Sequence, residues 1–428
     1  MKHFFPILLA LALLLSFTAC GKSNSAPSSV PEQPTAAEPT FAPEPSPASD
    51  PEPRQLCGKG LEWDFADGTL TISGQGPMDD FELLEAPWDV TGTSLSVKKL
   101  VVEEGVTYLG SNAFAACCNL SSVTLPSTLL SIGESAFADC MELTAVALPE
   151  ALLSVDSFAF AGSGLASLSL PSQLARIGDF AFSNCTALKE LTVPGSLLSL
   201  GTDAFLGCDG LVSVAVPGGS SAETLLRDTG LDEKLTLSAP VAAPVWEGTD
   251  GTLHWRLASG VLTLSGTDTI PDYSASGFDA APWAPMLAGV EKLLLPDGLT
   301  RIGTYAFWNC TALRSVALPD TLTEIGDYAF GACEKLETLS LPGSLRSIGV
   351  CSFSFCQSLT EIVLPDSLET IGEDAFRMCV AVRSVTAPGT IRTVGQGAFG
   401  FGCQEAPEIN APAGSPAAKA LEDAFPAA

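Results

Sequence analysis

The chain has 428 residues, of which 46% are hydrophobic and 16% are charged, and its formal net charge is −29. So acidic a chain repels nucleic-acid phosphates and anionic membrane surfaces, which excludes nucleic acid as a partner. The hydrophobic content suffices for an extensive core, and no later segment is long and apolar enough to be a transmembrane helix.

The N-terminal residues predict a targeting signal. Lys2 and His3 precede the apolar run 4–15, and the sequence FTAC at 17–20 follows. This pattern resembles a bacterial lipobox, although Phe17 stands where leucine is usual. The resemblance implies a signal peptide at 1–19, a lipid on Cys20, and a position on the extracellular face of the bacterial cell membrane, held only by that lipid. The alternative is an ordinary secretory signal that is cut elsewhere.

A tether is predicted at 20–56. Proline, serine, alanine and glutamate dominate this segment, and Phe41 is its only aromatic residue. Such a composition buries too little apolar surface to offset the entropy of ordering the chain. The prolines favour extended polyproline II, so the tether would display the remainder of the chain away from the membrane.

From about residue 95 onward the sequence is periodic, in units that we call rungs. A phenylalanine recurs mostly every 23 residues, in two sets of five. These phenylalanines are Phe114, Phe137, Phe160, Phe182, Phe205, Phe307, Phe330, Phe353, Phe376 and Phe399. A glycine stands four residues before each phenylalanine except Phe160, where Asp156 replaces it. A fixed period of this length indicates a solenoid of stacked repeats.

One complete rung, at 359–379, reads LTEIVLPDSLETIGEDAFRMC. Its first residues fit the pattern L-x-x-L-x-L, which predicts a strand that ends at Pro365. Gly372 is expected to adopt a backbone angle that other residues resist. Phe376 and Cys379 are expected on a single inward-facing helical turn.

The recurrence has an energetic reason. Burial is worth roughly 1.5–3 kcal/mol for each large apolar side chain. Ordering the backbone costs roughly 1–2 kcal/mol per residue, so a single rung is unstable alone. Stacked rungs share their apolar faces and strand hydrogen bonds, and the sum becomes favourable.

A column of cysteines occupies one repeat position. Its members are Cys117, Cys140, Cys185, Cys208, Cys310, Cys333, Cys356 and Cys379, with Cys403 one residue out of register. Paired zinc-ligand spacing is lacking, and parallel stacked side chains suit a disulfide poorly. We therefore expect buried free thiols and no metal, although a disulfide ladder is the alternative. Cys57, Cys118 and Cys351 lie outside the column and are unassigned.

Each set of five rungs has similar flanking segments. The sequence LEWDFADGTLTISG, from Leu61, matches LHWRLASGVLTLSG, from Leu253, and both predict hairpins. Ser220 and Ser415 resemble helix N-caps after the last rungs. The fold class is therefore predicted to be a leucine-rich repeat solenoid, β-strand-rich with short helical turns, made of two capped five-repeat modules at 57–238 and 239–428.

The rung resembles the BspA-type leucine-rich repeat, written L-x-x-[IV]-x-[IL]-P-x-x-[LV]-x-x-I-G-x-x-A-F-x-x-C, over about residues 95–405. The resemblance implies bacterial surface proteins that bind other proteins, in some members host matrix or other bacteria. It supplies no catalytic residues and no cofactor, and binding specificity does not transfer with a repeat.

An enzyme is not expected. After signal removal His254 is the only histidine, and its place in the hairpin alternation predicts a solvated surface position. The sequence has no nucleophile elbow, zinc-protease motif, phosphate-binding loop or calcium loop.

The function that we predict is a non-enzymatic surface lipoprotein for binding or adhesion, which recognises an extracellular or host protein through its strand faces. The candidate binding residues flank the predicted strands: Lys189, Glu190, Glu291, Lys292, Arg314, Glu337, Glu361 and Arg383. One alternative is carbohydrate binding, with Trp88, Trp283 and Trp308 as candidate stacking residues. Trp63 and Trp255 are assigned to the hairpin core. The other alternative is a targeting scaffold for another surface enzyme.

Overall fold

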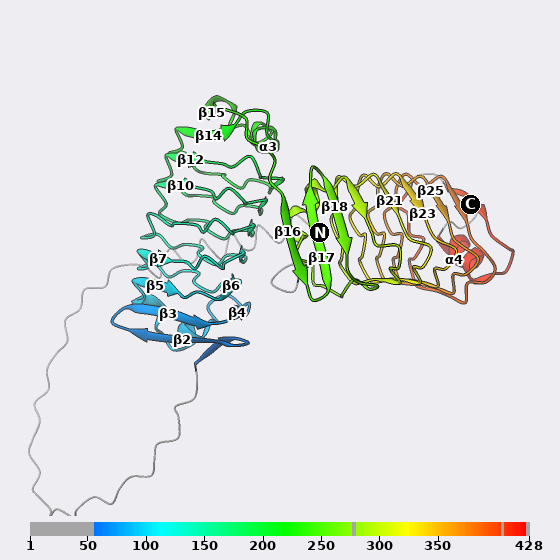
Figure 1. Ribbon diagram of the computed structural model, residues 1–428, viewed down its shortest axis with the longest axis horizontal. Helices are drawn as coiled ribbons and strands as arrows, with labels where there is room; N and C mark the ends of the chain where they lie inside the picture. Colours follow the sequence, from blue (N-terminus) through cyan, green and yellow to red (C-terminus); the bar gives the residue numbers. More distant parts are fainter. Residues whose placement is uncertain (1–54, 276–279, 404–405, 425–428) are drawn as a thin grey trace, which may run out of the picture.

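The computed structural model describes residues 55–275, 280–403 and 406–424. The predicted signal peptide, Cys20 and the tether up to residue 54 lie outside the described residues. The described part is a β-solenoid in which short strands of successive rungs lie side by side (Figure 1). The predicted leucine-rich repeat solenoid is thereby confirmed.

Each set of rungs begins with the predicted hairpin. Strands β2 (Leu61–Ala66) and β3 (Thr69–Gly74) pair antiparallel, as do β17 (Leu253–Ala258) and β18 (Val261–Ser265). An additional strand extends each hairpin at its outer edge: β1 (Leu56–Gly58) and β16 (Trp246–Asp250). On its inner edge each hairpin continues into the rungs, because β3 and β18 pair parallel with the strands that follow them.

The predicted strands form one side of the rungs, which we call the strand face. In the first set they are β5 (Lys99–Val102), β7 (Ser122–Thr124), β10 (Ser167–Ser169), β12 (Glu190–Thr192), β14 (Ser213–Pro217) and β15 (Leu235–Ser238). In the second set they are β19 (Lys292–Leu294), β21 (Ser315–Ala317), β23 (Thr338–Ser340), β25 (Glu361–Val363), β27 (Ser384–Thr386) and β29 (Glu408–Asn410). Equivalent residues pair in parallel register, for example Glu361 with Ser384.

A second column of very short strands precedes the recurring glycine. In the first set it comprises β4 (Gly76–Pro77), β6 (Val106–Leu109), β8 (Ser131–Ile132), β9 (Ser154–Val155), β11 (Arg176–Ile177) and β13 (Ser199–Leu200). In the second set it comprises β20 (Arg301–Ile302), β22 (Glu324–Ile325), β24 (Ser347–Ile348), β26 (Thr370–Ile371) and β28 (Thr393–Val394). Sequence analysis did not predict these strands, because two residues are too few to show an alternating pattern.

Helices are few and short among the described residues. Helix α3 (Ser221–Arg227) and helix α4 (Pro416–Ala424) follow the last rungs, and Ser220 and Ser415 cap them through bonds accepted from Glu223 N and Ala418 N. The predicted N-caps are therefore confirmed. Helix α2 (Pro87–Val90) and the 3-10 helices η1 (Ser94–Ser96), η2 (Asp232–Lys234) and η3 (Ala284–Gly289) lie in the connecting loops.

Stacked phenylalanine rings run through the middle of each set of rungs. Neighbouring rings have centroids 5.1 to 6.2 Å apart, and the interplanar angles are between 4° and 25°. The column continues into the opening loops, where Trp88 stacks on Phe114 and Trp283 on Phe307. The rings therefore form the continuous apolar interior that a single rung lacks.

The buried apolar residues fall into two clusters. One lies within residues 57–226, and the other extends over 246–421. Ala175 of the first set belongs to the second cluster, and Leu153 and Leu198 pack against it. The division into modules at 57–238 and 239–428 stays a prediction, because the two cores are in contact here.

The prediction of a special backbone angle at Gly372 is wrong. Positive φ occurs instead at Asp374 and Met378, two and six residues later, and equivalent positions repeat this pattern in most rungs. Gly372 is needed for space: a Cβ there would lie 2.4 Å from Val350 N and 2.5 Å from Gly349 C of the preceding rung. The glycine thus permits close backbone contact between rungs.

The predicted helical turn is also wrong. Residues 373–378 form two consecutive tight turns with left-handed residues, and their backbone bonds alternate between their own rung and the next one. Phe376 N, for example, donates to Ala398 O in the next rung at 2.9 Å. Because bonding between rungs replaces the internal bonds of a helix, the turn too depends on its neighbour.

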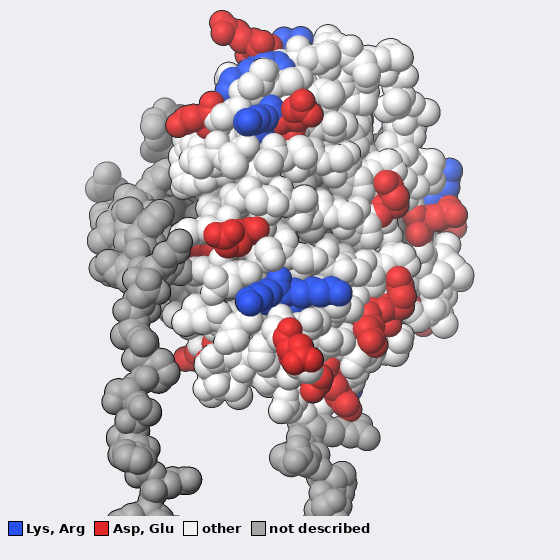
Figure 2. Space-filling view, turned by 90° about the vertical axis from the view of Figure 1, so that its left-hand side faces the viewer, with Lys and Arg blue, Asp and Glu red and all other residues white. Residues whose placement is uncertain are grey.

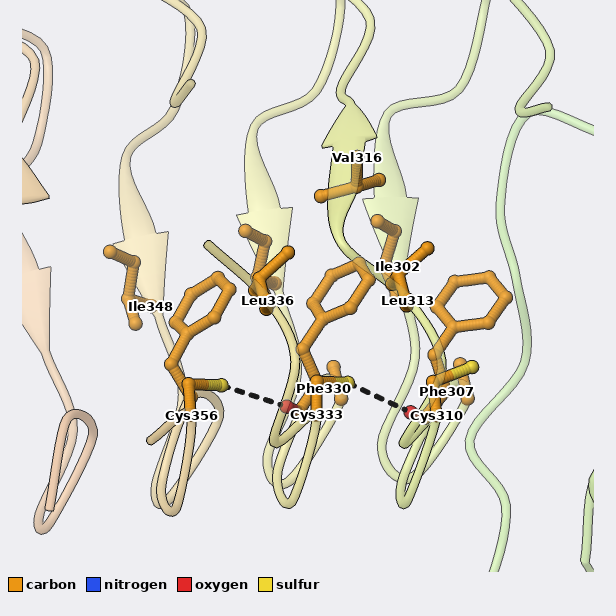
Figure 3. Packing of buried hydrophobic residues seen from close by; sticks show 14 of the residues in the cluster. Ile302, Phe307, Cys310, Leu313, Val316, Phe330, Cys333, Leu336, Ile348 and Cys356 are labelled. Atoms are coloured by element: carbon orange, nitrogen blue, oxygen red, sulfur yellow. Dashed lines mark hydrogen bonds between the residues drawn. The ribbon is translucent and has the colours of Figure 1, made fainter. Parts of the chain in front are cut away.

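The eight in-register cysteines of the column are buried free thiols, as predicted, whereas Cys403 is a partly exposed free thiol. In six rungs the Sγ donates to the phenylalanine carbonyl of the preceding rung at 3.1 to 3.5 Å, as Figure 3 shows for Cys333 and Cys356. Burial raises the pKa of Cys379 to about 12, which disfavours the reactive thiolate. Cys57 and Cys351 are also free thiols.

We predict that Gly372→Ala will destabilise the solenoid by about 1–3 kcal/mol, since backbone atoms cannot move aside as a flexible side chain can. Gly343→Ala is the matched control, because no atom lies within 4 Å of a Cβ placed there. Urea unfolding followed by circular dichroism measures both. Equal midpoints for the two variants would contradict the close-contact explanation.

We also predict that Phe376→Ala will cost roughly 3–5 kcal/mol through the cavity it leaves, because Phe376 is fully buried between Phe353 and Phe399. Phe355→Ala is the control, since Phe355 is 36% exposed in the neighbouring rung. The same unfolding measurement applies. A loss below about 1 kcal/mol for Phe376→Ala would show that this ring is not core.

Candidate binding surface

The strand face exposes alternate residues of each rung, because successive side chains of a strand point to opposite sides. In β25, Ile362 is buried, as is Leu364 just beyond it, whereas Glu361 and Val363 are exposed. The same alternation in each strand lines up the exposed residues of successive rungs in columns. Thr360, just before the strand, is exposed as well. The chemistry of this regular surface is therefore set by three positions per rung.

All eight predicted binding residues are exposed. The structure brings six of them together on neighbouring rungs of the second set: Glu291, Lys292, Arg314, Glu337, Glu361 and Arg383. Lys189 and Glu190 lie apart from these six, at β12 of the first set. Sequence analysis therefore identified one contiguous group and a separate pair.

Charges on this surface are partly neutralised between rungs. Arg314 Nη1 donates to Glu337 Oε1 at 2.5 Å, and both side chains stay more than half exposed. Arg383, one of the remaining candidates, forms no ion pair among the described residues. An exposed pair of this kind adds little stability, so both residues are available for recognition.

An uncharged column runs beside the charged ones. In the second set it contains Leu294, Ala317, Ser340, Val363 and Thr386, and Leu294 and Val363 are 43% and 48% exposed. Its counterpart in the first set contains Thr124, Ala147, Ser169, Thr192 and Ala215. Figure 2 looks onto the side of the first set that carries β5, β7, β10, β12 and β14, where scattered charges are separated by uncharged surface. An uncharged column bordered on one side by charged residues can serve as a protein-binding surface.

The prediction that Trp88 and Trp283 stack on a sugar is wrong. Trp88 and Trp283 are fully buried, and their Nε1 atoms donate to Ala113 O at 2.6 Å and Ala306 O at 2.8 Å. They extend the phenylalanine stack, so neither offers a ring face to a ligand. Trp308 is partly exposed and remains a candidate.

Trp63 and Trp255 are buried in the hairpins, as predicted for core residues. His254 is exposed on β17, which confirms the expected surface position. Among the described residues no group of three or more histidine, cysteine, aspartate or glutamate side chains could hold a metal ion. In the same part of the chain, no helix is both long and apolar enough to span a membrane.

A cavity of about 640 Å³ between the two sets of rungs was missed by sequence analysis. Its walls include Asp156, Arg176, Trp255, Tyr305 and Trp308. Burial raises the pKa of the Asp156 carboxyl, and the Arg176 guanidinium opposes that effect. Two breaks in the repeat could have identified this site: Asp156 replaces a glycine, and Trp308 stands where other rungs carry alanine, serine, glycine, leucine or arginine.

Comparison with known proteins places the chain among leucine-rich repeat proteins. The family described as BspA type leucine-rich repeat region matches residues 93–224 and 287–405, in six copies. These residues make up more than half of the chain, which therefore belongs to that family.

Similar solved structures are also bacterial leucine-rich repeat proteins. One from Eubacterium ventriosum is 22% identical, covering 80% of this chain and 93% of that one, with a TM-score of 0.36. A leucine-rich cell surface protein from Faecalibacterium prausnitzii is 20% identical, covering 87% and 98%, also with a TM-score of 0.36. The pneumococcal vaccine antigen PcpA is 19% identical, covering 84% and 88%, with a TM-score of 0.34. Curated proteins give no match.

Proposed function

We propose that this protein is a non-enzymatic binding or adhesion protein of the bacterial cell surface, which recognises an extracellular protein through the strand face of its second set of rungs. The observation that carries the proposal is the exposed uncharged column that includes Leu294 and Val363, with Arg314, Glu337, Glu361 and Arg383 along one side of it. Such an extended surface suits a protein partner better than a small substrate, which needs a concave site.

Membership in the BspA-type family supports this class of function, because its members are generally non-enzymatic repeat proteins. The name of the similar Faecalibacterium prausnitzii protein describes it as a cell surface protein, which agrees with the proposed location. We propose in addition that Cys20 carries the lipid that anchors the chain and that the segment up to residue 56 is the tether. Mass spectrometry of the mature N-terminus would test that anchor separately.

The partner can be sought with immobilised protein and a panel of purified extracellular matrix proteins. We predict that the double variant Arg314→Glu and Arg383→Glu will lower affinity for the captured partner at least about tenfold, because it reverses two charges beside the uncharged column. Surface plasmon resonance measures the change.

The matched control is the double variant Arg346→Glu and Arg392→Glu. It makes the same change in net charge and also breaks surface ion pairs, since both arginines pair with Glu369 beside the second strand column. The control should bind as the unaltered protein does. If the strand-face variant keeps full affinity, or both variants lose it equally, the partner does not use the proposed face.

A further inference from the structure

The cavity between the two sets of rungs is formed by parts of the chain that are distant in sequence. One wall comes from β8, β9 and β11, and the other from β16, β17, η3 and the rung of Trp308. Contacts hold the walls together: Trp246 Nε1 donates to Gln173 O at 3.2 Å, and Leu198 lies against Gly289. Its volume of about 640 Å³ is within the usual range for small-molecule sites.

Tyr305 and Trp308, two members of an aromatic cluster, line one side of the cavity. Tyr305 and Tyr328 stack with centroids 4.7 Å apart, and Trp308 meets both rings edge to face at 5.8 and 5.6 Å. Trp308 lies over Gly331 of the next rung, where a Cβ would come within 2.3 Å of the indole. All three rings remain partly exposed, so the cluster offers apolar surface to a ligand.

The opposite side is polar but balanced in charge. Arg176 Nη1 donates to Asp156 Oδ1 at 2.6 Å, and these side chains are 39% and 14% exposed. Ser131 Oγ and Ser154 Oγ lie 2.6 Å apart on the neighbouring strands. This wall combines donors and acceptors without a net charge, which favours a neutral ligand with several hydroxyl groups.

Trp255 lines the cavity with its ring, and its side chain is only 7% exposed. Its Nε1 is enclosed by the protein beside Gly248, so a ligand in the cavity meets the ring and not this donor. The indole of Trp246 donates to Gln173 O.

We propose that this cavity binds a neutral carbohydrate unit. A sugar ring has an apolar face that can lie on Trp308 and hydroxyl groups that can bond to Asp156, Arg176 and the Ser131–Ser154 pair. This site is independent of the strand face. Its location also differs from the opening loops, where the buried Trp88 and Trp283 cannot stack on a ligand.

The test uses the full chain on an array of neutral and acidic glycans, followed by calorimetry with each glycan that binds. At least one neutral glycan should bind. Trp308→Ala and Arg176→Met should each lower its affinity about fivefold to tenfold, through loss of ring contact and of a hydrogen-bond donor respectively. Trp308→Ala restores a residue found at this position in other rungs, including Ala115 and Ala138, so the fold should persist.

Leu206→Ala is the matched control, because exposed Leu206 occupies the position of Trp308 in a rung of the first set and does not line the cavity. It should leave glycan affinity unchanged, as should the Arg314→Glu and Arg383→Glu double variant. Binding of acidic glycans only, no glycan binding at all, or affinity that survives both cavity variants would overturn the proposal. A variant that loses the protein partner but still binds glycan has lost only the strand-face site. The two proposals can therefore fail separately.

Discussion

The close stacking of one rung on the next is the contact on which the rest of the structure depends. It brings backbone atoms so near at Gly372 that a Cβ would lie 2.4 Å from the preceding rung. At this separation Phe376 stacks on Phe353, and Phe376 N reaches Ala398 O of the following rung. Apolar burial and backbone hydrogen bonding are thus satisfied by the same neighbour, which is why neither rung is stable alone.

The same stacking explains the chemistry of the cysteine column. A small, weakly donating side chain fits beneath the phenylalanine ring and donates to a carbonyl of the preceding rung, as Cys356 does to Phe330 O. Burial raises the pKa of the Cys356 and Cys379 thiols, which disfavours their reactive thiolate forms. Their regular spacing therefore reflects packing, and a repeated reactive residue type does not by itself indicate a site.

Much of the solenoid could be predicted because its signals are repeated. The apolar positions of residues 359–379, the strand end at Pro365 and the cap at Ser220 all follow from local rules. The role of Gly372 could not be predicted, since steric contact with a residue 23 positions earlier leaves the same sequence signal as a positive φ. The tight turns were mistaken for a helix because Phe376 and Cys379 have helical spacing in either case.

Local sequence rules likewise predict some features of the candidate sites and not others. Exposure of Arg314 and Arg383 was predictable from their variable positions in the repeat pattern L-x-x-[IV]-x-[IL], whereas burial of Trp88 depended on its stacking against Phe114 across an irregular loop. The junction cavity joins Asp156 to Trp308, residues that no local pattern relates. Irregular residues within a regular repeat were the only sequence signals there. In repeat proteins such departures are a guide to sites, because the repeat itself accounts for the rest.

The most direct test of this account is to remove one whole rung. Deletion of residues 326–348 removes one period of 23 residues and joins Ile325 to Gly349, so that each remaining rung still finds an equivalent neighbour. The account predicts a β-rich protein that still unfolds cooperatively in urea at a somewhat lower midpoint, whereas deletion of only residues 326–337 should abolish that transition. If both deletions unfold the second set of rungs alike, or if neither does, stacking between equivalent rungs is not what holds the protein together.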